Sequence, residues 1–534
     1  MTQPLGGTPR RSAPQRACGL LFRGGVWPDR AHRSPLPLAL GAVVAALLLQ
    51  TTADPDLWGH LTFGRLTLTG GLARTDPFSF TAPGAPWLNH EWLSEVLSFV
   101  AFGALGPRGL VLFKVALAGA TLAVVSLAVR DLGGDARARA TVAVLVTIGS
   151  FPWFLTVRPQ LFTFVAFALC ILALVRADRR DRRLLWTLPA IVAVWSNLHG
   201  GVVAGVGVLG CWGTLRLLQV AVRAAGTAHD RRWLRGAPDV AGARAIAIVG
   251  VLIVPAVLAT PYGIGLWRFF AETLSVPRTD IGEWQPVSVA DLGDVLGVVA
   301  LLTLWGFQAR TTAVRDPVHL LLGVLLAAAA LHTRRHLPLA LVGTGVLLAP
   351  AVVRGLGTST MRWGRAPAVA VVATALAVLG TGLTRAGCVR VEPGTVPRTA
   401  VAYLHDAGVH GNLAVGFDWG EYAIFHLAPQ VKVSIDGRRE TVYSPARLTA
   451  HAAFVYGYHD WRKMLDQDHA DVALVSPRFA VYGLLERAPD WRLAYADSTS
   501  GLFVRRATAA DAALATTAPP PPTPENGECL GRDG

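Results

Sequence analysis

Residues 34–61 read SPLPLALGAVVAALLLQTTADPDLWGHL, an apolar run that leads directly into an acidic motif. The run at 35–52 has the length of roughly 17–25 residues that a helix needs to cross a bilayer. Ten more apolar stretches follow along the chain. They are expected to cross as helices at 109–129, 140–156, 161–175, 184–198, 201–222, 243–260, 294–308, 317–331, 337–353 and 366–384. The sequence therefore predicts an all-α polytopic membrane domain of about eleven spans over residues 35–390.

The composition of the whole chain agrees with a membrane protein. Its 534 residues are 52% hydrophobic and 16% charged, well below the roughly 25% charge of a soluble domain, and the mean hydropathy is +0.43. A soluble enzyme, a disordered scaffold and a secreted disulfide module are excluded. The net charge of +14 does not indicate nucleic acid, because nearly all of the 49 basic residues are arginines, a bias typical of a GC-rich bacterial genome. The five cysteines lack CxxC spacing, so neither a metal cluster nor a disulfide framework is predicted.

Arginines decide the predicted orientation. The first 34 residues hold six arginines and one acid, which predicts a cytoplasmic N-terminal segment. The short apolar stretch 93–105, which contains Glu95, sets the side of every later loop. If 93–105 lies along the membrane surface, the basic loops all fall inside, at 130–139, 176–183, 223–244 and 354–365. We therefore expect 93–105 to be an interfacial helix, with the N-terminus inside the cell and the C-terminus outside.

The first span also permits another interpretation. Thr51-Thr52-Ala53 weakly resembles a signal-peptidase site, so the N-terminal basic stretch and the first span could form a signal peptide. The 34 residues ahead of the span are long for that purpose. This length favours a retained anchor in the inner (plasma) membrane.

The chain changes character after the last span. Alternating segments at 412–417, 431–435, 472–475 and 502–504 predict strands, and 400–407 and 458–466 predict helices. Residues 395–506 are therefore expected to form a small extracytoplasmic α/β domain. Residues 507–534, which contain four prolines in a row at 519–522, are expected to be a disordered tail.

The unusual polar residues gather on one side of the predicted membrane. A large first outer loop, 53–108, carries Asp54, Asp56, His60, Asp76, His90 and Glu91. Later outer turns carry Arg158, His199, Glu283, His332, Arg334 and Arg335. The inner loops hold arginines and little else, and the middles of the spans are nearly free of charge. Acids, histidines and arginines confined to one face predict an outward-facing site.

Each of these residues also has a structural interpretation. Asp54 and Asp56 could cap the helix that begins near Leu57, and Asp76 before a proline is an ordinary turn opener. Arg158, at the end of a span, could extend its guanidinium to the membrane surface. The tryptophans of the first outer loop are more often interfacial belt residues than sugar platforms. The grouping of the residues, rather than any one of them, favours a function.

The outer motifs resemble a known family. They read DPDLWGHL at 54–61, RTDPFSFTAPG at 74–84, WLNHEWLSE at 87–95, VRPQLF at 157–162, SNLHGG at 196–201, TPYG at 260–263, GEWQP at 282–286 and SIDGR at 434–438. Together with the many spans and the C-terminal outer domain, they resemble the GT-C superfamily of membrane glycosyltransferases. Within it the chain is most similar to the bacterial group described as RgtA/B/C/D-like or mannosyltransferase-like, over residues 36–506.

The resemblance implies transfer of a hexose or pentose from a polyprenyl-phosphate-linked donor, on the outer membrane face, to an envelope glycan, lipid or protein. A carboxylate would accept the proton of the attacking hydroxyl, with Asp54 or Asp56 preferred and Asp76 or Glu91 in reserve. Arg158, Arg334 and Arg335 would hold the leaving phosphate, with His199 and His332 as further donors. His60, His90 and Glu283 complete the expected substrate-binding set.

A metal, the role of the outer domain and the function class stay open from sequence. Mg²⁺ or Mn²⁺ could be held by Asp54, Asp56 and His60, although many GT-C enzymes work without a metal. The outer motifs 418–422 and 436–438 could bind acceptor or act as a lid, and we expect no catalysis there. Two other functions compete with the enzyme. The chain could be a transporter or flippase of lipid-linked glycans, or a non-catalytic membrane assembly factor.

Overall fold

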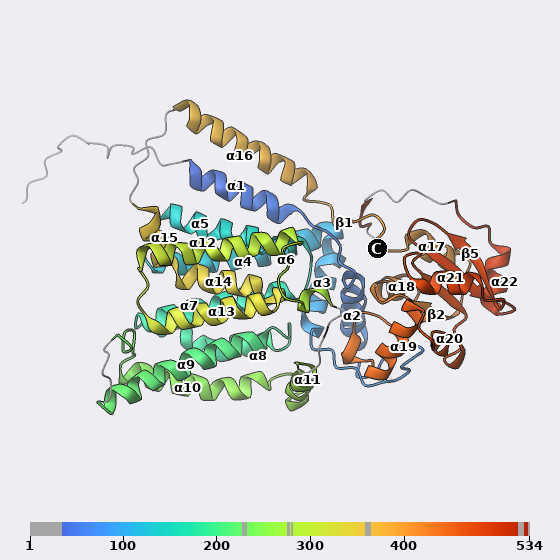
Figure 1. The fold of residues 1–534 in the computed structure, drawn as a ribbon, viewed down its shortest axis with the longest axis horizontal. Coiled ribbons are helices and arrows are strands. Elements are labelled where there is room, and N and C mark those ends of the chain that lie inside the picture. The colour runs from blue at the N-terminus through green and yellow to red at the C-terminus, as the bar shows by residue number, and fades with distance from the viewer. Residues whose placement is uncertain are drawn as a thin grey trace, which may run out of the picture.

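A computed structural model describes residues 35–226, 232–274, 278, 281–357, 365–521 and 528–531. The predicted cytoplasmic segment 1–34 lies outside these residues. A bundle of roughly parallel helices occupies one part of the molecule, and a smaller domain built on a β-sheet lies at one end of the bundle (Figure 1). This arrangement confirms the coarse prediction of a mostly helical chain followed by a small α/β domain.

Each segment predicted to span the membrane coincides with one or two helices of the structure. The helices are α1 (Leu36–Leu49), α4 (Pro107–Asp131), α5 (Ala136–Gly149) with α6 (Phe151–Leu155), α7 (Gln160–Asp178), α8 (Leu188–Trp195), α9 (Val202–Ala224), α10 (Val240–Val257), α12 (Leu292–Thr311), α13 (Pro317–His332), α14 (Leu337–Leu347) with α15 (Ala349–Leu356), and α16 (Arg365–Arg385). Within the described residues, six of these helices are long and apolar enough to cross a membrane, and the pair around α14 and α15, bent by 63°, makes a seventh. The exact count of eleven stays a prediction, because α1, α8 and α13 are short apolar helices.

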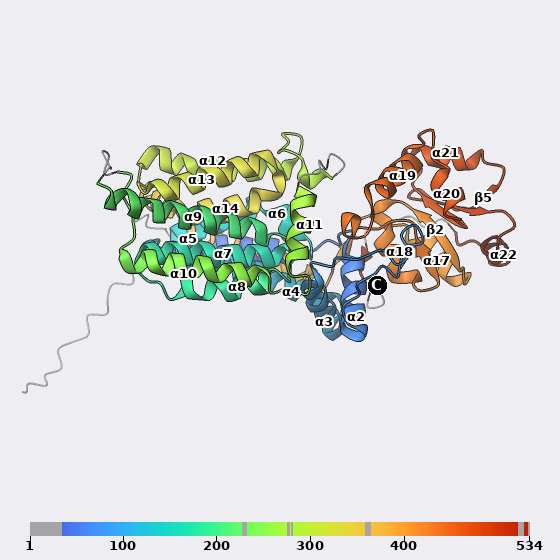
Figure 2. The same cartoon turned by 90° about the horizontal axis from the view of Figure 1, so that it is seen from below.

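The first outer loop folds into two helices that do not follow the bundle. Helices α2 (Leu57–Gly70) and α3 (Trp92–Leu105) run across the bundle direction at the end that carries the sheet domain (Figures 1 and 2). Helix α3 is 14 residues long and apolar. It has the position and length expected of the interfacial helix predicted at 93–105. A third crosswise helix, α11 (Ile264–Leu274), lies at the same end.

The opposite end of the bundle carries the basic loops. Helices α9 and α15 end there, and α10 and α16 begin there, away from the sheet domain (Figure 1). The arginine-rich loops and the polar outer motifs are thus separated by the length of the bundle. This separation is what the predicted orientation requires, and the orientation itself stays a prediction.

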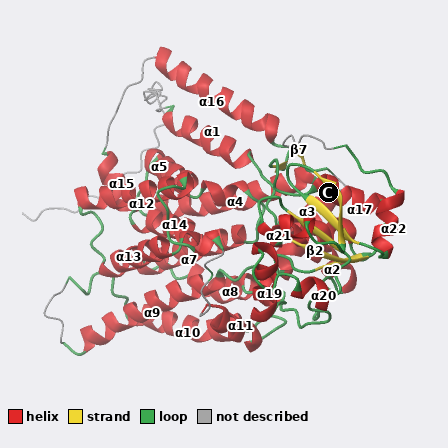
Figure 3. Cartoon of the chain, turned by 45° about the vertical axis from the view of Figure 1, so that its right-hand side comes forward, coloured by secondary structure: helices red, strands yellow, loops and turns green. Residues whose placement is uncertain are grey.

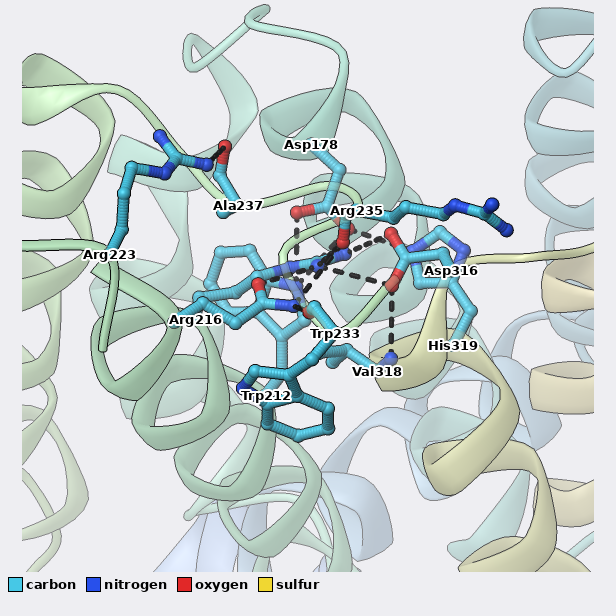
Figure 4. Close-up of polar contacts among 11 residues, drawn as sticks. Asp178, Trp212, Arg216, Arg223, Trp233, Arg235, Ala237, Asp316, Val318 and His319 are labelled. Carbon is cyan, nitrogen blue, oxygen red and sulfur yellow. Dashed lines mark hydrogen bonds and ion pairs between the residues drawn. The ribbon is translucent and has the colours of Figure 1, made fainter. Parts of the chain in front are cut away.

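A buried ionic network lies at this basic end of the bundle. Arg216, in the last third of the span predicted at 201–222, is fully buried in α9. Its Nη2 lies 2.6 Å from Asp178 Oδ2 and 2.7 Å from Asp316 Oδ2, and His319 Nε2 lies 2.8 Å from the same Asp178 oxygen. Figure 4 shows these four side chains converging from α7, α9 and the start of α13. The span carries a charge because acids from two other helix ends compensate it, a pairing that local sequence does not show.

The C-terminal domain contains a five-stranded mixed sheet, drawn in yellow in Figure 3. Its strands are β2 (Gly411–Val415), β3 (Val431–Val433), β4 (Val472–Val475), β5 (Trp491–Ala496) and β6 (Gly501–Arg505), in the order β3-β2-β4-β6-β5. Strand β2 pairs in parallel with β3 and β4, and β6 is antiparallel to β4 and β5. The four predicted strands correspond to β2, β3, β4 and β6. The prediction missed β5, an edge strand with a register shift and few buried residues.

Helices cover this sheet. They are α17 (Arg398–Asp406), α18 (Gly420–Leu427), α19 (Pro445–Tyr456), α20 (Lys463–Gln467) and α21 (Ala480–Glu486). Helix α17 matches the prediction at 400–407, whereas only the last part of the helix predicted at 458–466 forms. Helix α18 packs against α2 of the first outer loop, with Tyr422 edge-on to Trp58 at 4.9 Å. Trp58 is therefore a buried contact between the two domains rather than a membrane-belt residue.

The prediction of a disordered tail is wrong for residues 509–516, and the chain contains a disulfide although no disulfide framework was predicted. Helix α22 (Ala509–Thr516) packs on the outer domain, where Tyr403 Oη donates a hydrogen bond to the carbonyl of Leu514 at 2.8 Å. Cys388 and Cys529 form a disulfide across the two-stranded pair of β1 (Arg390–Val391) and β7 (Glu528–Cys529). The two cysteines are 141 residues apart, so their spacing held no sign of the bond.

The disulfide-linked strand is joined to the acidic motif. The N–H of Arg390 donates to the carbonyl of Thr51 at 2.8 Å, and the N–H of Ala53 donates to the carbonyl of Arg390 at 2.7 Å. On its other side, Thr52 donates to the carbonyl of Leu155 at 2.9 Å. The backbone just before Asp54 is thus held between the bundle and the outer domain.

The disulfide offers a test of orientation that does not depend on arginines. Structural disulfides persist in oxidising compartments and are rare in the cytosol. We expect peptides containing Cys388 and Cys529 to be linked in protein from cells quenched with N-ethylmaleimide, and to separate only after reduction. Mass spectrometry of digested membranes measures this. Free, alkylated Cys388 and Cys529 in unreduced samples would place the outer domain in the cytosol and contradict the predicted topology.

Candidate active site

A cavity of about 620 Å³ lies where the bundle meets the outer domain. Nine of the twelve predicted site residues line it: Asp56, His60, His90, Glu91, Arg158, His199, Glu283, Arg334 and Arg335. The outer motifs also meet in pairs around it. For example, Trp92 Nε1 donates to Asn197 Oδ1 at 3.1 Å, and the backbone N–H of Asn89 donates to Tyr262 Oη at 2.9 Å. Segments more than 100 residues apart thus build one site.

The two acids of the first motif have different environments. Asp54 is buried behind the cavity, where its Oδ1 accepts the backbone N–H of Asp56 at 3.1 Å and its Oδ2 binds Arg158 Nη2 at 2.7 Å. Asp56 occupies the N-cap position of α2, yet its side chain makes no capping bond. Its side chain is 37% exposed and lines the cavity. Of the pair, Asp56 is therefore the carboxylate that a bound molecule can reach.

The protein around the cavity raises the pKa of Asp56. Although the side chain opens into the cavity, the protein atoms around it displace much of the water near its carboxyl group; this desolvation has the largest effect, the nearby charge of Asp54 adds to it, and the pKa rises to about 7. Arg158 acts in the opposite direction, with its Nη2 at 3.4 Å from Asp56 Oδ2. A general base works best when its pKa is near the working pH. Asp56 meets this condition.

Arg158 links the acidic motif to the fourth outer loop. Its guanidinium bonds Asp54 and Asp56 on one side and Glu283, in η2 (Gly282–Trp284), on the other. Burial alone would lower the pKa of Arg158, but Asp54 and Glu283 raise it, so the guanidinium stays charged. With three carboxylate partners, Arg158 is an orienting residue more than a free ligand for phosphate.

His199 is held in one tautomer. Its Nδ1 accepts the backbone N–H of Gly201 at 2.9 Å and the hydroxyl of Thr163 at 2.7 Å, while Thr163 accepts from Trp195 Nε1. Burial lowers the pKa of His199 to about 3, so the ring is neutral. Because Nδ1 accepts the N–H of Gly201, the ring proton is on Nε2, which lies 3.5 Å from Glu91 Oε1 and faces a second donor, Arg335 Nη2, at 3.3 Å. His199 presents an N–H donor at the cavity wall.

Glu91 is a poorer base than Asp56. Burial alone would raise the pKa of Glu91, but the charge of the neighbouring His90 contributes to a net lowering. His90 Nε2 lies 3.6 Å from its Oε1. A carboxylate with a lowered pKa accepts a proton less readily. Glu91 is better suited to orienting the two imidazoles.

The two arginines at 334 and 335 have different tasks. Arg334 bonds Asp291 at 3.0 Å, Asp294 at 3.3 Å and the carbonyl of Gly282 at 2.7 Å, so it ties the fourth outer loop together. Arg335 lies 4.0 Å from Glu283 Oε2, and its guanidinium carbon is 5.2 Å from the centre of the Trp284 ring. Among the described residues, the contact of Arg335 with a carboxylate is this long ion pair, and its Nη2 faces His199 Nε2 at 3.3 Å, so Arg335 is the cavity arginine best placed to bind an added anion.

Three predicted residues do not line the cavity. Besides Asp54, these are Asp76 and His332, which is exposed beyond it. Asp76 is buried beneath the cavity, where its Oδ1 binds Arg438 Nη2 at 2.8 Å and its Oδ2 accepts from the N–H of Ser79 at 3.1 Å. His60, which does line the cavity, has Nδ1 at 3.6 Å from Glu95 Oε1.

The outer domain contributes more residues to the site than the sequence predicted. Glu421, Gly437 and Arg438 line the cavity, and they come from the motifs at 418–422 and 436–438. In the sequence, those two motifs were the sign that the outer domain contributes residues to the site. Asp436 accepts from Arg438 Nε at 2.8 Å and Nη2 at 2.6 Å. The outer domain therefore forms part of the cavity wall.

The side chains do not gather a divalent-metal site at the acidic motif. Among the described residues, the group of three potential ligands within 4.8 Å of one another is Asp178, Asp316 and His319, at the far end of the bundle. Arg216 already lies between those two acids. Asp54 and Asp56 share Arg158, and His60 faces Glu95. The ligand set of Asp54, Asp56 and His60 considered from sequence is therefore not assembled.

Comparisons with known proteins give a distant structural likeness. No protein-family model and no curated protein matches the chain. The crystal structure of ArnT from Cupriavidus metallidurans bound to undecaprenyl phosphate is similar, with a TM-score of 0.48 and 13% identity over 89% of this chain and 98% of that one. Its apo form gives 0.47 and 14%, over 88% and 96%. A likeness of this size does not assign a function.

Proposed function

We propose that this chain is an integral inner-membrane glycosyltransferase of the GT-C type that uses a polyprenyl-phosphate-linked sugar as donor. The observation that carries the proposal is a continuous ionic chain along the cavity wall. It runs from Asp56 through Arg158 and Glu283 to Arg335. A base with a pKa near neutrality thus stands at one end, and a cation able to bind phosphate at the other. Sugar transfer from a lipid phosphate needs both groups in one cavity.

The reaction follows from these positions. The acceptor hydroxyl attacks the anomeric carbon while Asp56 accepts its proton. The bond from that carbon to the phosphate oxygen breaks, and the electron pair leaves with the polyprenyl phosphate. Arg335 and the Nε2–H of His199 stabilise the charge that develops on the phosphate. Asp54 and Glu283 hold Arg158, which keeps Asp56 in place.

An apolar wall beside these groups suits the lipid. Trp153, Phe164, Phe269, Phe270 and Leu339 line the same cavity. Phe269 and Phe270 come from α11, and Trp153 and Phe164 from α6 and the start of α7. Isoprenoid carbon atoms next to the phosphate would contact these side chains and so be buried away from water.

Two competing functions fit the molecule less well. Transporters bind their substrates near the midplane of the membrane, whereas this cavity lies at one end of the bundle against the outer domain. Two basic side chains are fully buried in the described part of the bundle: Arg216 is paired with two acids, and Lys114 Nζ donates to the carbonyls of Gln50 and Phe154. A non-catalytic assembly factor has no need for a carboxylate with a raised pKa opposite an available cation. The donor sugar and the acceptor (glycan, lipid or protein) are left to experiment.

The test is sugar transfer by the purified, reconstituted protein. Labelled sugar on synthetic polyprenyl phosphates is the donor, and membrane glycan is the acceptor. We expect Arg335→Met to lower kcat/KM by about 10²–10³-fold, the typical loss when one donor to a developing anion is removed. Arg487→Met, on an exposed arginine of the outer domain, is the control and should retain full activity. Equal activity of the Arg335 variant and wild type, or no transfer by wild type with any donor, would contradict the proposal.

A further inference from the structure

One carboxyl group in the cavity has no part in the reaction above. Glu421, near the start of α18, comes from the outer domain and is only 5% exposed. Its Oε2 is buried and has no hydrogen-bond partner among the described residues. A buried, unpartnered carboxyl oxygen costs free energy. Its presence beside the acidic motif therefore calls for a functional reason.

Two glycines from different domains make room for this carboxyl group. A Cβ at Gly59, in α2, would lie 1.9 Å from Glu421 Oε2. A Cβ at Gly437, in the outer domain, would lie 2.5 Å from Glu421 Oε1 and 2.8 Å from Asp56 Oδ1. Glu421 Oε1 and Asp56 Oδ1 thus both approach Gly437, while the unpartnered Oε2 faces Gly59. Any larger residue at position 437 would push against both.

The surroundings of Glu421 favour its neutral form. Burial, with the nearby charges of Asp56 and Asp436, raises its pKa well above the usual value. Two carboxyl groups that share a small space avoid ionising together. The titratable and charged groups that face this pair are Asp54, His60, Glu95, Arg158, Glu283, Asp436 and Arg438.

We propose that Glu421 is a positioning residue for Asp56: its protonated carboxyl group donates a hydrogen bond to Asp56 Oδ1 and holds the base in place for the acceptor hydroxyl. This inference rests on the proposed function and adds to it that the outer domain completes the active site. A hydrogen bond donated to the ionised form of a carboxylate favours that form. Glu421 therefore offsets part of the burial and charge effects that raise the pKa of Asp56.

Two variants of Glu421 separate this role from a packing role. Glu421→Met keeps the length of the side chain and removes the donor. We expect the acid limb of its kcat/KM profile to move to higher pH by about one to two units, since a hydrogen bond to a charged group contributes roughly 1.5–3 kcal/mol. Glu421→Gln keeps an N–H donor, so its profile should match that of wild type. KM for the donor should stay the same in both, because Glu421 acts through Asp56.

The direction in which the acid limb of the kcat/KM profile moves tests the proposal. If Glu421 were ionised, its removal would relieve repulsion and move the acid limb to lower pH in both variants. That result, or an unchanged profile in Glu421→Met, would overturn the proposal. Gly437→Ala is a second test of the same hydrogen bond, because its new methyl group would separate the carboxyl groups of Glu421 and Asp56. This variant should show the same shift of the acid limb as Glu421→Met. Gly483→Ala is the matched control, because a Cβ there has no atom within 4 Å, and its profile should not move.

An infrared measurement tests whether the carboxyl group of Glu421 is protonated, and it does not require enzyme activity. A protonated carboxyl group has a C=O stretching band that a carboxylate lacks. The difference spectrum between wild type and Glu421→Gln at neutral pH should contain this band. A missing band would overturn the proposal. If the band is present while no donor supports transfer, the hydrogen bond between Glu421 and Asp56 stands and the proposed function fails.

Discussion

Asp56→Asn should abolish sugar transfer while leaving the fold intact. Asparagine has nearly the same shape but cannot accept the proton of the acceptor hydroxyl. Removal of a general base typically lowers kcat by about 10²–10⁴-fold. The side chain caps no helix and lines the cavity, so its amide is tolerated by the fold. Transfer assays combined with thermal unfolding of the same samples measure both effects.

The pH dependence of wild type gives an independent test of the same residue. Asp56 must be ionised to act as a base, and its pKa is raised to about 7. Activity should therefore be low in acid and rise as the pH passes through about 7. Asp54→Asn removes a like charge that raises the pKa of Asp56, so the acid limb should move to lower pH in that variant. Normal transfer by Asp56→Asn would assign the base to another residue.

Arg438→Met should cause the largest loss of stability among the cavity variants. Arg438 is almost fully buried, between Asp436 at 2.6 Å and Asp76 at 2.8 Å. Burial alone would lower the pKa of Arg438, but Asp436 holds it well above its usual value, so the charge is kept. Without the guanidinium, two buried carboxylates lose their partner. Breaking such a pair typically costs about 3–5 kcal/mol in the free energy of unfolding.

The same substitution should also loosen the outer domain from the first outer loop. Asp76 belongs to the loop and Asp436 to the outer domain, so Arg438 joins the two. Its guanidinium carbon also lies 4.7 Å from the centre of the Trp87 ring. Arg487→Met is the control, since Arg487 is an exposed arginine of the same domain, and it should lose about 0.5 kcal/mol or less. Chemical unfolding of both variants in detergent measures the difference, and equal losses would contradict the assignment.

The sequence was sufficient for the features that depend on local properties. Hydrophobic length placed a helix at each predicted span, and the period-two alternation placed four of the five strands of the outer domain. Polar motifs in the outer loops located the site region, because charged and hydrogen-bonding groups avoid the lipid side of a membrane span. Nine of the twelve predicted residues line one cavity for this reason.

The choice among the predicted acids depended on tertiary contacts. From sequence, Asp54 and Asp56 are equivalent, one on each side of a proline. In the folded chain Asp54 is buried against Arg158, whereas Asp56 faces the cavity. Asp76 looked like another candidate base but is enclosed with Arg438. Burial and partner distance decide protonation, and neither is a property of a short segment.

The sequence by itself determined a polytopic helical membrane protein with polar motifs grouped at one end and a small α/β domain at its C-terminus, because apolar run length, charge and alternation are read residue by residue. Only the tertiary structure decided that Glu421 and Arg438 of the outer domain enter the cavity, that Arg216 is paired inside the bundle, and that Cys388 bonds Cys529. Each of these contacts joins residues far apart in the chain. Their energies depend on desolvation and on separations of a few ångströms, which appear only when the chain is folded.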